Sequence, residues 1–143
     1  MPIQFIFTNT VIHLSERKRL KLFIERIFGQ NKRALTNLSI IFCTDEYLLD
    51  INKRFLQHDY FTDIITFNLS EDANIIEGEI YISVDRIREN AADNKVSINK
   101  ELHRVIFHGV LHLCGYKDKV SADKKEMTRL EDESLNKFFL SQK

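Results

Sequence analysis

Two histidines four residues apart, His108 and His112, are the residues of this chain whose types and spacing most directly suggest chemistry. In an α-helix with about 3.6 residues per turn, side chains at this spacing share one face, where two imidazole nitrogens reach a single metal ion. Gly115 follows, and glycine tolerates the left-handed backbone with which helices commonly end. Asp118 can then return to the same point. Two imidazoles and a carboxylate leave one tetrahedral position open, as in a catalytic zinc site.

The spacing matches the extended zincin pattern H-E-x-x-H-x-x-G-x-x-H, with Asp118 at the position of the last ligand. The residue after the first histidine is Gly109, whereas a zincin protease has a glutamate there as general base. Glycine cannot take that role, which disfavours peptide hydrolysis. There are two alternatives to a catalytic ion. The histidines could be purely structural, or Cys114 could be the fourth ligand of a closed, structural zinc site. Residue 114 lies on a different helix face from the histidines, which disfavours the closed site.

The elements that must position these residues can be predicted from hydrophobic periodicity. Segments rich in β-branched and aromatic residues predict strands at 3–7, 38–43, 63–69 and 78–84. Apolar residues at helical spacing predict a helix after each of the first two strands and three helices after the last. The residues expected to begin these helices are Ser15, Thr44 or Asp45, Ser83 or Asp85, Ser97 and Ser121, and Gly29 is expected to end the first.

The predicted order is β-α-β-α-β-β-α-α-α, which indicates an α+β (mixed α/β) fold. We expect one small mixed sheet of about four strands with helices packed on it, the fourth helix carrying the zincin-like pattern. The face of that helix expected to be buried comprises Leu102, Val105, Ile106, Gly109 and Leu113. The 143 residues fit a single domain, 1–143, with no visible linker.

Composition places few further limits on function. The formal net charge is zero, so any surface for nucleic acid must come from local clusters of basic residues. No run approaches the ~18 apolar residues of a membrane span, and the first residues lack the features of a signal peptide. We expect a cytoplasmic protein without a membrane partner. Cys43 and Cys114 are expected to be reduced thiols, with Cys43 in the core.

Two groups of basic residues are candidates for phosphate contact. Residues 15–33 carry many lysines and arginines, which form either a phosphate-binding stripe or simply the solvated face of a helix. The lysines that flank the candidate metal ligands are Lys117, Lys119, Lys124 and Lys125. Tyr60 and Phe61 either stack on bases or pack beneath their loop.

Three stretches resemble a known family, the YbeY endoribonucleases. HGVLHLCGYKDK (108–119) is similar to that family's H-G-x-L-H-L-x-G-Y-D-H. INKRFLQHDYFTDIITF (51–67) is similar to L-N-x-x-Y-R-G-x-D-x-P-T-D-V-L-S-F, and GEIYIS (78–83) to G-D-I-x-I-S. The order of the three motifs is also the family's. The departures are Asp118 in place of the third histidine ligand, Leu56 in place of an arginine and Phe61 in place of a proline.

The resemblance implies a metal-dependent, single-strand-preferring endoribonuclease that acts in rRNA 3′-end maturation and ribosome quality control. One Zn²⁺ per chain would be held by His108, His112 and Asp118, which would also be the catalytic residues. The implied partners are single-stranded or ribosomal RNA, with ribosomal proteins or a ribosome-associated GTPase. The alternatives are a metallopeptidase-like hydrolase and a non-catalytic ribosome-associated factor with a structural metal. Asp63, Glu79 or backbone carbonyls are expected to accept the second N–H of each ligand histidine.

Overall fold

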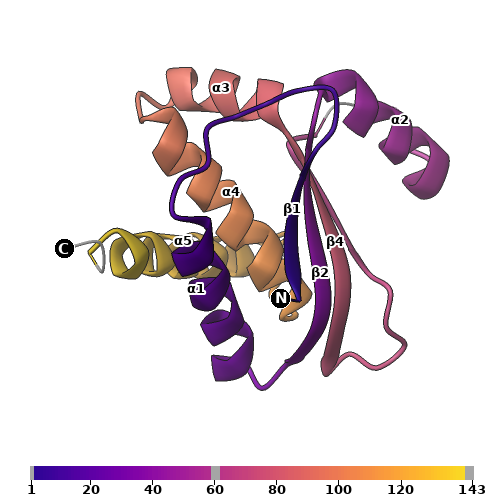
Figure 1. Ribbon diagram of the computed structural model, residues 1–143, viewed down its shortest axis with the longest axis vertical. Helices are drawn as coiled ribbons and strands as arrows, with labels where there is room; N and C mark the ends of the chain where they lie inside the picture. The colour runs from indigo at the N-terminus through magenta and orange to yellow at the C-terminus, as the bar shows by residue number, and fades with distance from the viewer. Residues whose placement is uncertain (1, 59–61, 141–143) are drawn as a thin grey trace.

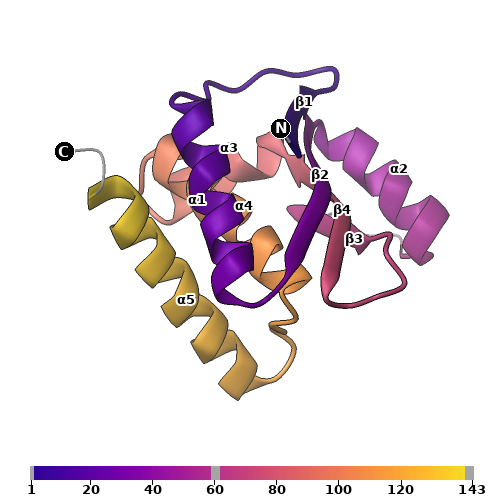
Figure 2. The ribbon, with the colours of Figure 1, turned by 60° about the horizontal axis from the view of Figure 1, so that its bottom comes forward.

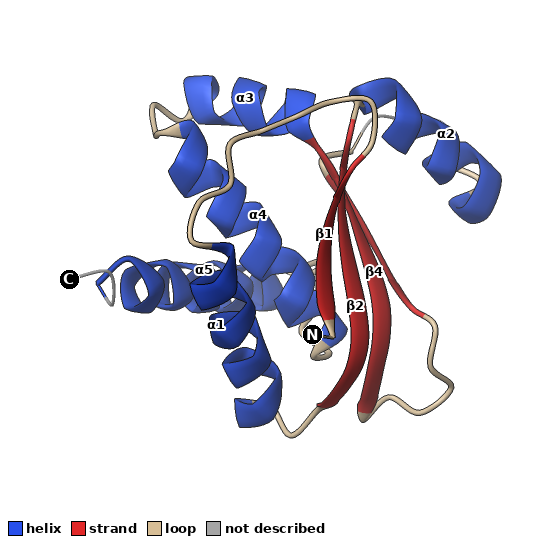
Figure 3. Cartoon of the chain, viewed as in Figure 1, coloured by secondary structure: helices blue, strands red, loops and turns tan. Residues whose placement is uncertain are grey.

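The computed structural model describes residues 2–58 and 62–140 and contains the predicted sequence of strands and helices. The strands are β1 (Ile3–Phe7), β2 (Ala34–Cys43), β3 (Ile64–Asn68) and β4 (Ile75–Ser83). The helices are α1 (Arg17–Gln30), α2 (Asp45–Leu56), α3 (Val84–Asp93), α4 (Ile98–Leu113) and α5 (Ser121–Leu140). Figure 3 shows strands and helices separated into layers, which confirms the predicted α+β class.

The strands form one mixed sheet in the order β1-β2-β4-β3. β1, β2 and β4 are parallel, and β3 is antiparallel to β4 at the edge. Both β2 and β4 are longer than predicted, because their pairing continues back to Ala34 opposite Ile75. The turn between β3 and β4 lets the chain form the antiparallel edge strand directly, without a crossover.

The helices cover the two faces of the sheet unequally. Helices α1, α3, α4 and α5 gather on one side in Figure 1, whereas α2 lies on the other side, as Figure 2 also shows. The main core fills the space between the larger helical group and the sheet. A smaller core beneath α2 contains Cys43, Leu48, Ile51 and Ile65. The predicted burial of Cys43 is therefore confirmed, and this burial raises the pKa of its thiol to about 12, helped by the charges of Asp45 and Asp85.

Helix α4 occupies the centre of the helical layer, in contact with α1, α3, α5, β3 and β4. Its predicted inward face is buried as expected. Gly109 on this face allows an unusually close approach to the sheet. A Cβ added there would lie 2.8 Å from Ile64 Cδ1 and 3.0 Å from Ile80 Cγ2. The glycine therefore sets the distance between α4 and the two strands beneath it.

Most of the predicted helix starts are confirmed by their caps. The hydroxyls of Thr44, Ser83 and Ser97 each accept a backbone N–H of the following turn. Helix α5 begins at Ser121 as predicted. Among the described helices, none combines the length and the apolar character needed to cross a bilayer.

Both predictions for the ends of α1 are wrong. The residue before the helix is Glu16, in a left-handed conformation with no side-chain cap, rather than Ser15. At the other end the helix continues through Gly29 to Gln30, and Asn31 is the capping residue. The left-handed backbone expected of glycine is taken by Lys32, with φ of 58°.

His103 on α4 points away from the predicted metal ligands, into an aromatic cluster. Its ring lies 5.1 Å from that of Phe138 in a stacked arrangement and 5.2 Å from that of Phe139. Its Nδ1 is 2.7 Å from the carbonyl oxygen of Asn99, and its Nε2 has no hydrogen-bond partner among the described residues. Burial lowers the pKa of His103, the Asn99 carbonyl opposes this shift, and nearby Arg19 reinforces it.

This environment predicts a specific pH dependence of stability. The unfolded chain takes up a proton at His103 at a higher pH than the folded chain does, so acidification favours unfolding between the two pKa values. We expect the free energy of unfolding to fall between about pH 7.5 and about pH 5 more steeply in the wild type than in His103→Phe. Urea denaturation at both pH values measures the difference. Equal slopes for the two proteins would contradict the prediction.

Candidate metal centre

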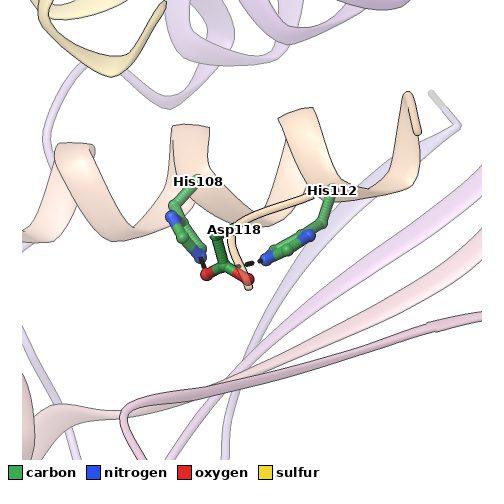
Figure 4. Close-up of side chains that lie close together, drawn as sticks. All are labelled: His108, His112 and Asp118. Carbon is green, nitrogen blue, oxygen red and sulfur yellow. Dashed lines mark ion pairs between the residues drawn. The ribbon is translucent and has the colours of Figure 1, made fainter. Parts of the chain in front are cut away.

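The structure brings together the three residues that the sequence pattern singles out. His108 Nε2 lies 3.3 Å from Asp118 Oδ2, and His112 Nε2 lies 3.4 Å from the same oxygen. Figure 4 shows both imidazoles projecting from α4 toward the Asp118 carboxylate. One ligand atom from each residue lies within 4.8 Å of the others. All three side chains are only partly buried, with exposed fractions of 21%, 25% and 39% in sequence order.

These distances fit a shared tetrahedral ion. Ligand atoms at zinc–nitrogen or zinc–oxygen bond lengths in a tetrahedral site lie roughly 3.3–3.4 Å apart. The two distances to Asp118 Oδ2 have these values. Two imidazoles and one carboxylate are also a donor set that Zn²⁺ accepts, with one position left for water or substrate. The residues present therefore fit a divalent metal.

The turn after α4 carries Asp118 back to the histidines, as predicted. Gly115 has φ of +104°, a left-handed conformation that strains any other residue, and this confirms its predicted role as the helix stop. Hydrogen bonds with residues that follow α1 also hold this turn in place. Arg33 Nη2 donates to the carbonyl oxygen of Cys114 at 2.8 Å, and the Tyr116 hydroxyl donates to Asn31 Oδ1 at 2.9 Å.

The second nitrogen of each imidazole is held by a different kind of acceptor. His112 Nδ1 lies 2.9 Å from the backbone carbonyl oxygen of Tyr116. His108 Nδ1 lies 2.5 Å from Glu131 Oε2. A carbonyl and a carboxylate only accept, so each Nδ1 carries the proton and donates. The lone pair of each Nε2 is therefore available on the side of Asp118.

Glu131 was missed by the sequence interpretation, which named Asp63 and Glu79 as acceptors. Both choices are wrong, because Glu79 instead accepts from the Tyr81 hydroxyl and Asp63 makes no hydrogen bond to either imidazole. The backbone alternative is correct for His112. A signal for Glu131 was present, since it falls at helical spacing between Met127 and Leu135, among the buried residues of α5. An acidic residue on an apolar face commonly has a buried partner.

The electrostatic environment of the centre is negative. Burial by itself lowers the pKa of His108, but the hydrogen bond and charge of Glu131, with Asp118 and Asp63, raise it overall. Burial raises the pKa of Asp63, against the opposing charge of His108. Arg104 is the basic residue paired with Glu131. Three carboxyl groups around two imidazoles form a site suited to a cation.

The centre opens into a cleft of about 510 Å³. Lys119 lines this cleft, unlike the other three flanking lysines that the sequence singled out. Leu56, at the position of the family arginine, also lines it and is 39% exposed. His58 lies at the cleft, whereas Tyr60 and Phe61 fall outside the described residues. Lys119 and His58 can therefore meet an anionic substrate beside the candidate ligands.

Two residues of the basic stripe on α1 have other contacts. The Arg17 guanidinium lies 5.2 Å from the centre of the Phe7 ring, and Lys21 Nζ lies 5.5 Å from that of Phe5. These are cation–π contacts with β1. None of the basic residues at positions 15–33 is among the described residues that line the cleft.

Cys114 does not join the ligand group. It is buried, and burial raises the pKa of its thiol to about 12. Among the described residues, the cluster that could hold a metal contains only His108, His112 and Asp118. The prediction that Cys114 lies on another helix face is consistent with this arrangement.

Comparison with known proteins agrees with the resemblance found in the sequence. The family profile described as Endoribonuclease YbeY matches residues 6–139. A Cytophaga hutchinsonii protein named Endoribonuclease YbeY is 46% identical over 134 residues, covering 94% of each chain. A Flavobacterium psychrophilum protein of the same name is 50% identical over 116 residues, covering 81% of each. A solution structure from Thermotoga maritima has a TM-score of 0.62 at 25% identity, covering 98% of this chain and 91% of that one. The chain described here therefore belongs to the YbeY family.

Proposed function

We propose that this protein is a metal-dependent endoribonuclease that cuts single-stranded RNA in rRNA 3′-end maturation and ribosome quality control. The observation that carries the proposal is the convergence of His108, His112 and Asp118 at one cleft, in a chain whose relatives are named endoribonucleases. We further propose that residues 1–143 form one cytoplasmic domain with one zinc ion. Ribosomal proteins or a ribosome-associated GTPase are the proposed protein partners.

Different residues of the chain would have different roles in such a reaction. The Nε2 atoms of His108 and His112 and the carboxylate of Asp118 would hold the ion, while Glu131 and the Tyr116 carbonyl orient the two imidazoles. A bound divalent ion would polarise a phosphodiester oxygen and make a hydroxyl more acidic. Lys119 at the cleft can neutralise part of the charge on an RNA phosphate.

The structure gives a physical reason to prefer this reaction over peptide hydrolysis. The zincin general base would have to occupy position 109, which faces the sheet and where a Cβ alone would lie 2.8 Å from Ile64 Cδ1 and 3.0 Å from Ile80 Cγ2. Metal-assisted activation of a hydroxyl needs no glutamate at that position. A closed structural zinc site is also disfavoured, since the described cluster offers three ligand residues and leaves a position open to the cleft.

Metal removal tests the proposal directly. We expect the purified protein to carry one zinc per chain by mass spectrometry and to cleave a single-stranded rRNA 3′-end oligonucleotide. Dialysis against a chelator should abolish cleavage, because in the proposed reaction the ion is the group that makes the attacking hydroxyl more acidic. Adding one equivalent of Zn²⁺ should restore it, and a fully duplex RNA should be cut more slowly. Cleavage by the metal-free protein would contradict the proposal.

A further inference from the structure

We propose that Glu131 is a positioning residue of the metal centre, which holds His108 with its Nδ1 protonated and its Nε2 directed at the ion. Arg104 in turn fixes the Glu131 carboxylate. This inference rests on the proposed metal-dependent function, and it concerns how the ligand is oriented. It assigns a role in the centre to α5, a helix that contributes none of the three candidate ligands.

Glu131 is placed where such a role requires it. Its side chain is only 9% exposed and comes from α5, 23 residues after His108 in the chain. One carboxylate oxygen, Oε2, lies 2.5 Å from His108 Nδ1. The other, Oε1, accepts from Arg104 Nη1 at 2.9 Å. Both oxygens are therefore engaged, and the carboxylate is held on two sides.

Arg104 connects this carboxylate to the surface. It lies one helical turn before His108 on α4, so α4 supplies both the ligand and the cation that orients its acceptor. Its Nη2 contacts Asp132 Oδ1 at 2.5 Å, and Asp132 is largely exposed. The resulting chain of contacts runs from Asp132 through Arg104 and Glu131 to His108. Such linked charged groups hold one another in a single geometry.

The two ligand histidines are held unequally. His112 donates to a neutral carbonyl of its own turn, whereas His108 donates to a buried carboxylate from another helix. Hydrogen bonds to an ionised acceptor are about twice as strong as neutral ones. A carboxylate partner also makes an imidazole a more basic ligand. Glu131 should therefore strengthen the His108 side of the centre.

A purely structural role is the competing explanation. In that case Glu131 and Arg104 would serve only as an ion pair that joins α5 to α4, and metal affinity would not depend on them. The two explanations predict different results for Zn²⁺ affinity at equal folding. Glu133 is the matched control, because it lies on the same helix, is exposed and pairs with Arg129 and Lys137.

The experiment measures Zn²⁺ affinity of the metal-free protein by competition with a chromophoric chelator, for the wild type, Glu131→Ala, Glu131→Gln and Glu133→Gln. We expect Glu131→Ala to weaken affinity roughly 10- to 100-fold. Glu131→Gln, which keeps an acceptor but loses the charge, should show a smaller loss, and Glu133→Gln none. Proton NMR of the zinc-loaded protein should show the downfield His108 Nδ1–H resonance, which Glu131→Ala removes.

Each result decides the proposal. Wild-type affinity in Glu131→Ala, or an equal loss in Glu133→Gln, would overturn it. Should Glu131→Ala fail to fold, Glu131→Gln decides: unchanged affinity and an unchanged imidazole resonance would overturn it. A wild type that binds no Zn²⁺ would overturn both this inference and the metal assignment. A wild type that binds Zn²⁺ but cuts no RNA would overturn the proposed activity alone, leaving the affinity comparison as the test of Glu131.

Discussion

Replacing His112 with alanine should abolish both zinc binding and cleavage of single-stranded RNA, while the chain remains folded. The imidazole supplies one of three candidate ligand atoms, and the remaining histidine and carboxylate cannot enclose an ion. The cost to folding should be small, because the side chain is 25% exposed and its hydrogen bond to the Tyr116 carbonyl is worth about 1 kcal/mol. Metal content by mass spectrometry, cleavage on gels and circular dichroism measure the three quantities.

His13→Ala is the matched control for this variant. His13 is an exposed histidine outside the candidate centre, so its removal should leave zinc content and cleavage at wild-type levels. Cleavage that persists in metal-free His112→Ala would exclude a catalytic ion. Unfolding of His112→Ala, with His13→Ala unaffected, would instead favour a structural ion that holds the turn after α4 in place.

The candidate centre could be predicted from sequence because its three ligand residues lie within one helix and the turn behind it. The spacing of His108 and His112 fixes their common face, and Gly115 permits the turn that returns Asp118. These are local constraints, which depend on helix geometry and on the conformational freedom of one glycine. No knowledge of the remaining fold is needed to place the three side chains near one another.

The groups that surround the centre could not be predicted in the same way. Glu131 reaches His108 only because α5 packs against α4, and hydrophobic periodicity does not specify which helices become neighbours. The mistaken choice of Asp63 illustrates the limit. Asp63 does lie at the same cleft and interacts electrostatically with His108, yet the hydrogen bond goes to a residue 23 positions along the chain. The presence of an acidic residue in a neighbouring sequence motif is therefore a weaker guide to the hydrogen-bond partner of His108 than the packing of α5 against α4.

Helix ends show a similar division between local and tertiary causes. Ser97 was correctly predicted, and Thr44 and Ser83 were each one of two predicted candidates. All three hydroxyls accept N–H groups of the next turn, a purely local effect. Ser15 was wrongly predicted. Burial of Leu14 and the hydrogen bond from Arg17 to its carbonyl shape the entry to α1 instead. These contacts depend on the core that the preceding loop helps to form.

Gly109→Glu should destabilise the protein by more than about 3 kcal/mol, because it forces a carboxylate into an apolar contact where a Cβ alone would lie within 3.0 Å of the Ile64 and Ile80 side chains. The substitution restores the zincin glutamate in sequence, yet position 109 faces Ile64 and Ile80 of the sheet. We therefore expect a lower urea midpoint or loss of the folded state, and no peptidase activity.

Gly29→Glu is the matched control, because it makes the same substitution in another helix. It distinguishes the effect of the close contact at position 109 from the general effect of replacing a helical glycine with glutamate. Gly29 lies within α1, and a Cβ there would meet nothing within 4 Å. Losing a helical glycine favours the helix, so Gly29→Glu should remain within about 1 kcal/mol of the wild type. A Gly109→Glu protein as stable as Gly29→Glu would show that α4 can move away from β3 and β4. In that case the close contact between α4 and the sheet would not explain why position 109, beside His108, is a glycine.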